Sequence, residues 1–359
     1  MNRLTSIVLA IAVMGCGRLG FDATGDGRPP AELTRRNRID VRGSVLAEGV
    51  VEFPLLVQLR APEFDSVAVR ADGADLRFYA ADQITELPYD LEQVSAIGAD
   101  AWVRIPQIAS GTDDVIWVYY GNATAAAGQR PEQVWSTEYI AVWHLGSDGR
   151  DSTSNHLDGT FTGTAVTTGV AGLGRDLQLG WLEVSDAPPL AMIGSNGTAT
   201  WSAWAKPVAI ESITSALIDR QAGTTAADDF RLGPTSAGDL NGQINLDPGQ
   251  QDLAWAGGSF TYGVWQLFAM VRDGSTLRAS VNGVPVSTVV GTGTGHASAN
   301  PVWLGAGCNN CSGSPTNDHM DGVLDEARIE SVARSDGWLT AEYLNLTGGL
   351  VVVSPFEQN

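Results

Sequence analysis

Three acidic residues near the end of the chain are the first candidates for chemistry. Asp325, Glu326 and Glu330 lie in the segment that we expect to form the last long strand. A glycosidase needs two carboxyl groups held roughly 5–10 Å apart across the scissile bond. Neighbouring side chains of a regular strand point to opposite faces, so Asp325 and Glu326 would not face one substrate. The spacing therefore disfavours hydrolysis and predicts a solvated strand end.

The histidines show no catalytic spacing either. His144, His156, His296 and His319 are scattered, and the chain contains neither a His-Glu-x-x-His run nor a Gly-x-Ser-x-Gly elbow. Those motifs place zinc ligands on one helix face or expose a nucleophilic serine on a tight turn. The sequence therefore predicts histidines at the surface or at the edge of the core, rather than a zinc or serine hydrolase.

A short acidic loop could hold a cation. Asp148, Asp151, Asn155 and Asp158 offer oxygen atoms close together, which is the ligand type that Ca²⁺ prefers. Their spacing is not that of an EF-hand. The alternative is that these side chains hydrogen-bond their own backbone and form turns. The spacing alone does not decide between a calcium site and a set of turn-forming residues.

Tryptophan side chains could stack on sugar rings. Trp181, Trp255 and Trp303 are the tryptophans least clearly committed to a strand core, and Asn309 and Asn310 could form a polar rim. Such a site would combine aromatic faces with amides and carboxylates that hold sugar hydroxyls. The alternative is that each ring belongs to the core, where tryptophan is usually buried.

The amino terminus has the pattern of an export signal. Arg3 precedes an apolar run over residues 4–13 that is too short to span a bilayer, and Cys16 follows a small residue. This arrangement resembles the lipobox of bacterial lipoproteins, which implies that residues 1–15 are removed and Cys16 is lipidated. Gly17 after the cysteine would imply the outer membrane of a diderm bacterium. An ordinary signal peptide is the alternative.

Residues 16–33 are rich in Gly, Asp and Pro and predict a flexible tether between the lipid anchor and the folded part. The two remaining cysteines, Cys308 and Cys311, lie beside Gly-rich segments. In an exported chain, such a pair predicts a local disulfide. Free thiols, or a functional role for the pair, are the alternatives.

The composition favours an all-β protein of two domains. Charged residues make up only 17% of the 359 residues, whereas glycine occurs 42 times, which suits short strands joined by turns. The formal net charge of −20 repels nucleic acid and anionic headgroups. We therefore expect no nucleic-acid partner, and membrane contact through a lipid anchor alone.

The first domain is predicted over residues 34–135. Its strand candidates alternate well, and Val51, Phe53, Leu55, Val57 and Leu59 would share one face. Five motifs occur in order at residues 53–57, 70–78, 87–89, 101–106 and 118–122. On these motifs the segment resembles the domain of unknown function 2341, a β-rich module for which the resemblance implies no activity.

The second domain is predicted over residues 139–350. Motifs at residues 151–159, 200–207, 281–283 and 322–329 resemble the laminin-G-like, concanavalin A-like lectin and glucanase superfamily. The resemblance implies a β-sandwich of the jelly-roll type. It also implies that an acidic residue near the last strand, here Asp325, could complete a calcium site.

Local patterns within the second domain predict individual elements. Trp201 and Trp204 are three residues apart, so they would face opposite sides of a strand. Turns at residues 273–274 and 282–283 would bracket another strand. Residues 335–346 predict a short helix that Ser335 caps.

These observations together predict a cell-envelope lipoprotein with two β-sandwich domains. Its lectin-like domain would bind a glycan or a surface protein without catalysis. An enzyme that acts on polysaccharide through an unrecognised site, and a structural or adhesion spacer, are the alternatives. Because one fold hosts many functions, the site must decide among them.

Overall fold

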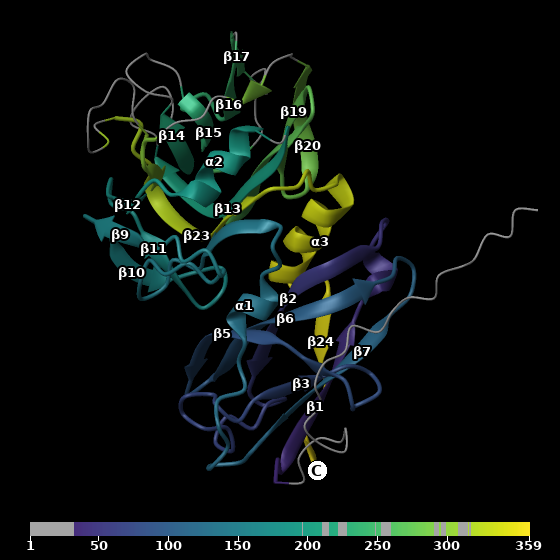
Figure 1. The fold of residues 1–359 in the computed structure, drawn as a ribbon. Helices are drawn as coiled ribbons and strands as arrows, with labels where there is room; N and C mark the ends of the chain where they lie inside the picture. The colour runs from purple at the N-terminus through teal and green to yellow at the C-terminus, as the bar shows by residue number, and fades with distance from the viewer. Residues whose placement is uncertain are drawn as a thin grey trace, which may run out of the picture.

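The chain folds into two stacked pairs of β-sheets (Figure 1). The computed structural model describes residues 32–195, 197–209, 215–221, 228–247, 249–252, 260–290, 294–295, 299–307, 315 and 317–359. In this part of the chain the expected all-β class with two sandwich domains is confirmed.

The N-terminal domain is a sandwich of a six-stranded and a three-stranded sheet. The six-stranded β1 sheet contains β1 (Arg35–Val41), β7 (Asp114–Tyr120), β3 (Arg77–Tyr79), β4 (Glu86–Leu87), β24 (Val351–Val353) and β25 (Glu357–Gln358). The three-stranded β2 sheet contains β2 (Val50–Arg60), β6 (Gly98–Ile108) and β5 (Tyr89–Ser95). A continuous apolar core fills the space between them.

The expected alternation of β2 breaks at Glu52. Val51 pairs with Gln107 and Phe53 with Ile105, so the register is unchanged across Glu52, which has a positive φ of 54°. Val50 and Phe53 are buried, whereas Val51 is 59% exposed. The prediction that Val51 shares a face with Phe53 is therefore wrong, because the left-handed conformation of Glu52 interrupts the regular pleat.

Both ends of the chain contribute to the β1 sheet. Strand β24 pairs with the second half of β1, in the register Ile39↔Val353. Strand β25 pairs with the first half, in the register Arg36↔Glu357. Residues that follow the predicted second domain are therefore part of the N-terminal sandwich.

The C-terminal domain is a sandwich of two eight-stranded sheets. The β13 sheet contains β10 (Ala165–Thr168), β11 (Leu173–Asp176), β23 (Asp321–Glu330), β13 (Thr198–Ala209), β18 (Gln266–Asp273), β19 (Thr276–Val281), β20 (Val284–Val290) and β8 (Tyr139–Trp143). The β15 sheet contains β17 (Gly249–Asp252), β16 (Leu240–Asp247), β15 (Asp228–Pro234), β14 (Ile218–Gln221), β22 (Val302–Leu304), β12 (Trp181–Val184), β9 (Gly159–Thr162) and β21 (Thr294–Gly295). Apolar side chains from both sheets form the core between them.

The local predictions for this domain are confirmed. Trp201 lies in the sandwich core, whereas Trp204 belongs to the cluster on the other face of the β13 sheet. Gly274 and Asn282 have φ of 59° and 57°, as the tight turns at either end of β19 require. Helix α3 (Asp336–Leu346) begins where predicted, and the Ser335 hydroxyl accepts the backbone N–H of Trp338.

Two further short helices, α1 (Pro131–Val134) and α2 (Pro188–Ser195), complete the described helices, apart from the one-turn 3₁₀ segment Gly43–Val45. None of the described helices is long and apolar enough to cross a membrane. Helix α3 lies between the two domains in Figure 1 and leads into β24.

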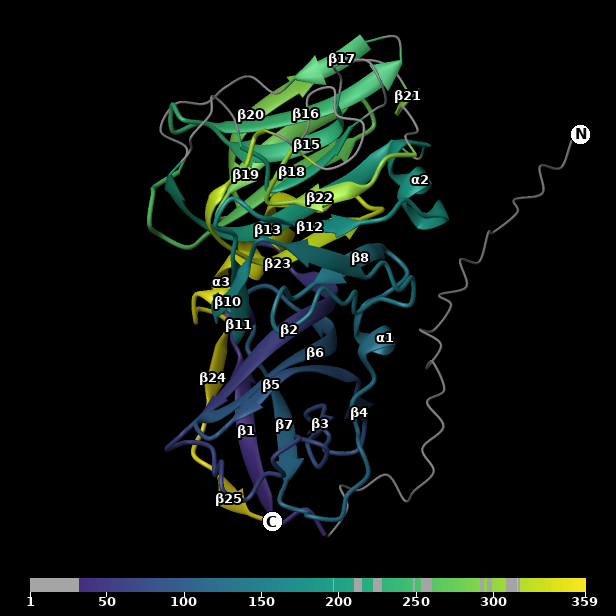
Figure 2. The same ribbon diagram turned by 90° about the vertical axis from the view of Figure 1, so that its left-hand side faces the viewer.

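The two sandwiches meet along the outer faces of the β2 sheet and the β13 sheet (Figure 2). Leu56 and Trp102 from the first domain form one buried cluster with Trp204 and Leu346 from the second. The Asn345 side chain accepts the Leu56 N–H at 2.7 Å and donates to the Leu56 carbonyl at 3.0 Å. Its amide therefore replaces a backbone partner at the edge of β2. We call this contact region the domain junction.

Candidate functional site

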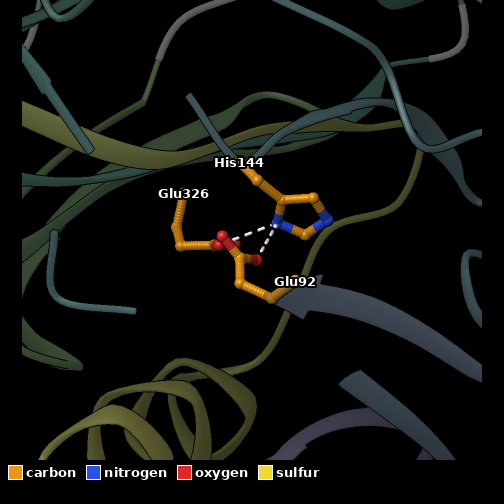
Figure 3. A group of neighbouring side chains, drawn as sticks. All are labelled: Glu92, His144 and Glu326. Carbon is orange, nitrogen blue, oxygen red and sulfur yellow. Dashed lines mark hydrogen bonds and ion pairs between the residues drawn. The ribbon is translucent and has the colours of Figure 1, made fainter. Parts of the chain in front are cut away.

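A histidine surrounded by carboxylates lies at the domain junction (Figure 3). His144 Nδ1 is 2.7 Å from Glu326 Oε1 and 3.0 Å from Glu92 Oε2. Its Nε2 is 3.2 Å from Asp90 Oδ2. The His144 side chain is 15% exposed, and Glu326 is fully buried. One imidazole thus contacts three carboxylates that come from both domains.

Strand β5 and two indoles position the carboxylates of the N-terminal domain. Asp90 and Glu92 are alternate residues of β5, so both point to the outer face of the β2 sheet. The Trp102 indole N–H donates to Glu92 Oε2 at 3.0 Å. The Trp135 indole N–H, just after α1, donates to Asp90 Oδ2 at 2.9 Å. Both carboxylates are therefore held in place by groups other than His144.

A β-bulge in β23 positions the acids of the C-terminal domain. The register of β23 on β13 shifts between the pairs Ser202↔Arg328 and Trp204↔Asp325, and Glu326 has φ of 49°. Leu324 and Ala327 on either side fill the sandwich core. The prediction that Asp325 and Glu326 point to opposite faces of a solvated strand end is therefore wrong, because the bulge turns both carboxylates toward the buried junction.

Arg328 links this histidine to helix α3. Its guanidinium contacts Glu326 Oε2 and Glu342 Oε1, each at 3.0 Å. The same group lies over the ring of Trp102, 4.6 Å from its centroid. We call these contacting side chains, with Asp325, the junction cluster: Asp90, Glu92, His144, Asp325, Glu326, Arg328 and Glu342.

Asp325 has a separate role within the junction cluster. Its Oδ2 accepts the backbone N–H groups of Val170 and Ala171 at 2.8 and 3.1 Å. A Cβ atom at Gly169 would lie 2.2 Å from that oxygen, so this turn needs glycine to approach the carboxylate. Asp325 therefore anchors the turn before β11.

The junction cluster holds five carboxyl groups and only two basic side chains, so its pKa values are strongly shifted. Burial raises the pKa of Glu92 and of Asp325, and the neighbouring acids raise the pKa of Asp325 further. Burial opposes the charge on His144, but Glu326 and Glu92 outweigh it and raise the His144 pKa well above its ordinary value. For Glu326 burial is likewise outweighed by His144, and its pKa is lowered.

These pKa shifts indicate that positive and negative charges balance within the buried junction cluster. An ionised Glu326 faces a protonated His144, and Asp90 is also ionised, because the hydrogen bond from His144 outweighs the burial that opposes its charge and lowers its pKa. Glu92 and Asp325 retain protons to higher pH. The cluster can thus hold protons or bind a cation.

The sequence did not single out this site. In the described part of the chain, Glu92, His144 and Glu326 are the group of three His, Cys, Asp or Glu residues whose ligand atoms all lie within 4.8 Å of one another. His144 and Glu326 are 182 residues apart, and no spacing rule joins them. The signal that could have indicated this site is the run of charged residues at 325–330, because it lies in a strand that the domain buries.

The predicted calcium ligands serve mainly as turn formers in the structure. The Asp151 carboxylate accepts backbone N–H groups from Val142, Thr153 and Leu157. Asp158 accepts the N–H of Asp151, and Asp148 accepts the N–H of Arg150. Asn155 donates to the Ile140 carbonyl. Among the described residues, these acids and Asp325 do not form a group of three within ligand distance.

The predicted sugar-binding tryptophans separate into different environments. Trp303 is buried, and its indole N–H donates to Glu183 Oε2 at 3.1 Å, so its ring does not offer a face to solvent. Trp181 is half-buried and lies beside His319, with 5.7 Å between ring centroids. The predictions for Cys16, Trp255, Cys308, Asn309, Asn310 and Cys311 concern positions outside the described residues.

Trp181 stands at one side of a polar row on the outer face of the β15 sheet. Leu182 and Val184 fill the core, so Trp181 and Glu183 point outward. The register places Glu183 beside Trp303, Trp303 beside Asp219, and Asp219 beside Arg231. We call this set, Trp181, Glu183, Trp303, Asp219 and Arg231, the outer row.

Two segments of the chain match models of known protein families. Residues 72–157 match the model described as a domain of unknown function, DUF2341. Residues 180–339 match the model described as the concanavalin A-like lectin/glucanases superfamily. The chain carries a DUF2341 segment followed by a concanavalin A-like domain. Both resemblances expected from the sequence are thus confirmed, and no curated protein matches the chain.

Solved structures similar to the chain include sugar-bound domains. Domain 4 of AbnA, an extracellular arabinanase of Geobacillus stearothermophilus in complex with arabinotriose, is 18% identical, with a TM-score of 0.45 over 56% of this chain and 97% of that one. The Ruminococcus gnavus IT-sialidase CBM40 bound to α2,3-sialyllactose is 18% identical, with a TM-score of 0.36 over 51% and 98%. The binding domain of Paraclostridial Mosquitocidal Protein 1 is 13% identical, with a TM-score of 0.45 over 57% of this chain and 52% of its own length.

Proposed function

We propose that this protein is a lipid-anchored glycan-binding protein of the cell envelope and that its concanavalin A-like domain binds without catalysis. The observation that carries this proposal is the position of Trp181. Its half-buried ring stands on the outer face of the β15 sheet, next to Glu183 and His319. An aromatic ring beside a carboxylate is the combination that recognises a sugar, since the ring covers its apolar face and the carboxylate accepts its hydroxyls.

The environment of the strand acids supports binding rather than hydrolysis. Glu326 and Glu330 are fully buried and form ion pairs with Arg328 and Arg334. A glycosidase needs two carboxyl groups on either side of a bound substrate. Their burial leaves no such arrangement to these residues, and we assign Glu326 to the domain junction and Glu330 to its ion pair with Arg334.

Cys16 and residues 16–33 complete the proposal. A lipid on Cys16 would hold the protein on the membrane, at the outer membrane in a diderm bacterium, and the tether would separate the sandwiches from the lipid surface. Calcium in the loop at residues 148–158 remains part of this proposal. Palmitate labelling tests the anchor: wild type should take up the label, and Cys16→Ser should lose both the label and membrane attachment.

The glycan proposal is tested on a polysaccharide array with the full chain, first with calcium and then with chelator. Saturable binding should weaken at least about 10-fold in Trp181→Ala, which is about 1.4 kcal/mol. Trp117→Ala is the matched control, because Trp117 is also half-buried but lies on β7 of the other domain. Loss of binding in chelator alone would place calcium in the site.

Other results would favour the alternatives. Release of reducing sugar or unsaturated product from a bound polysaccharide would favour the enzyme. Absence of binding in both conditions would favour the structural or adhesion spacer. Equal binding by wild type and Trp181→Ala would remove Trp181 from the site.

A further inference from the structure

We propose that Glu92, His144 and Glu326 bind one divalent metal ion such as Zn²⁺, and that this ion joins the two domains (Figure 3). The ligand atoms are His144 Nδ1, Glu326 Oε1 and Glu92 Oε2. They come from the end of β8, from β23 and from β5, so the ion would connect one strand of the N-terminal domain with two segments of the concanavalin A-like domain.

The contacts of His144 Nδ1 favour an ion at this point. Two carboxylate oxygens lie within 3.0 Å of a ring nitrogen that has room for one proton. A metal ion in place of that proton would bind all three atoms at once. Bonds of about 2.0–2.2 Å in a tetrahedral site separate ligand atoms by about 3.4 Å, so the side chains need to open by only about 0.5 Å.

The groups behind the three ligands are an independent observation in favour of the site. A histidine that binds a metal almost always donates its other ring N–H to a carboxylate or carbonyl. His144 Nε2 faces Asp90 Oδ2, which Trp135 holds from behind. Glu326 is held by Arg328 through its second oxygen, Oε2. Glu92 is likewise fixed, by the indole of Trp102.

The donor set also indicates the kind of ion. One imidazole and two carboxylates suit Zn²⁺, Co²⁺ or Mn²⁺, whereas Ca²⁺ takes 6–8 oxygen ligands. Glu92 and Glu326, when both are ionised, together match the charge of a divalent cation. Of the three ligands, His144 is the one nearest to solvent, with 15% of its side chain exposed.

The test uses the full chain with its three cysteines replaced by serine, so that thiols do not compete for metal. We titrate it with Co²⁺ and follow the visible absorption of the bound ion, then displace Co²⁺ with Zn²⁺. We expect one ion per chain, a higher melting temperature with Zn²⁺, and no shift with Ca²⁺. The result does not depend on whether the protein binds a glycan.

Variants locate the ion. His144→Asn and Glu92→Gln should each weaken Co²⁺ binding at least about 100-fold, and Asp90→Asn should weaken it by about 10–100-fold through the orientation of His144. His156→Asn is the matched control, because that histidine is 66% exposed and pairs with Glu132 rather than with a ligand. If His144→Asn fails to fold by circular dichroism, Glu92→Gln decides the outcome. Absence of saturable binding at micromolar metal, or binding unchanged in the folded variants, would overturn the proposal.

Discussion

The two faces of strand β23 are equally buried but are filled in opposite ways. Leu324 and Ile329 point into the apolar core of the concanavalin A-like sandwich. Glu326 and Arg328 point into the domain junction and are held by ion pairs and hydrogen bonds. The first face needs only shape and volume, whereas the second needs every charge to meet its partner. Burial therefore does not distinguish the faces, but the kind of partner does.

This difference makes the charged face of β23 the more selective for how the two domains dock. An apolar junction could slide with little loss, since dispersion contacts are not directional. A small rotation at the junction cluster would separate Glu92 from His144 and leave buried charges without partners. We therefore expect the charged face to specify the docking geometry more strictly than the apolar face does.

The largest effect that we expect comes from the charged face. Arg328→Met leaves Glu326 and Glu342 without their shared cation in a buried site, which should lower the free energy of unfolding by about 3–5 kcal/mol. Urea unfolding at pH 7 measures the change. Arg38→Met is the control, because that side chain is 50% exposed and should change stability by less than about 0.5 kcal/mol. A loss below about 1 kcal/mol for Arg328→Met would show that charges do not govern this face.

The next effect depends on pH. Burial raises the pKa of Glu342 from 4.5 to about 7, so the folded protein binds a proton there that the unfolded chain releases. The contribution of Glu342 to stability is therefore present below about pH 4.5 and is lost as the pH rises to about 7. At 1.36 kcal/mol for each unit, the loss is about 3 kcal/mol.

Glu342→Gln checks this expectation, because the amide does not titrate. Between pH 4.5 and pH 8, wild type should lose about 3 kcal/mol more than the variant in urea unfolding. Glu357→Gln, at a side chain that is 52% exposed, should follow wild type. Parallel pH profiles for wild type and Glu342→Gln would contradict the expectation.

The smallest effect comes from the apolar face. Ile329→Val removes one buried methylene group and should lower the free energy of unfolding by about 0.5–1.5 kcal/mol. Because Ile329 packs within the apolar cluster of the sandwich core, the loss should be the same at pH 5 and pH 8. Urea unfolding at both values measures it. A loss that varies with pH would mean that the two faces of β23 are energetically coupled.

The sequence predicted many of the strands and α3, because strand alternation, turn residues and helix caps are local patterns, and it predicted the two families through their motifs. It did not predict the junction cluster. The bulge at Glu326 in β23 and the positive φ of Glu52 in β2 each redirect a side chain without a distinct sequence signal. The contact between His144 and Glu326 also depends on the docking of whole domains. The periodicity of a sequence indicates that a residue is buried, but it does not identify the distant residue that the buried side chain contacts.

The pairing of β24 and β25 with β1 has a consequence for how the chain folds during synthesis. Strand β1 is among the first described segments to be made, but Glu357, the partner of Arg36, follows 321 residues later. Contacts between such distant segments slow folding, since a long loop must close before they form. The N-terminal sandwich is thus made before the concanavalin A-like domain but completes its sheet after it, and the edge of β1 stays open until β24 and β25 have been made.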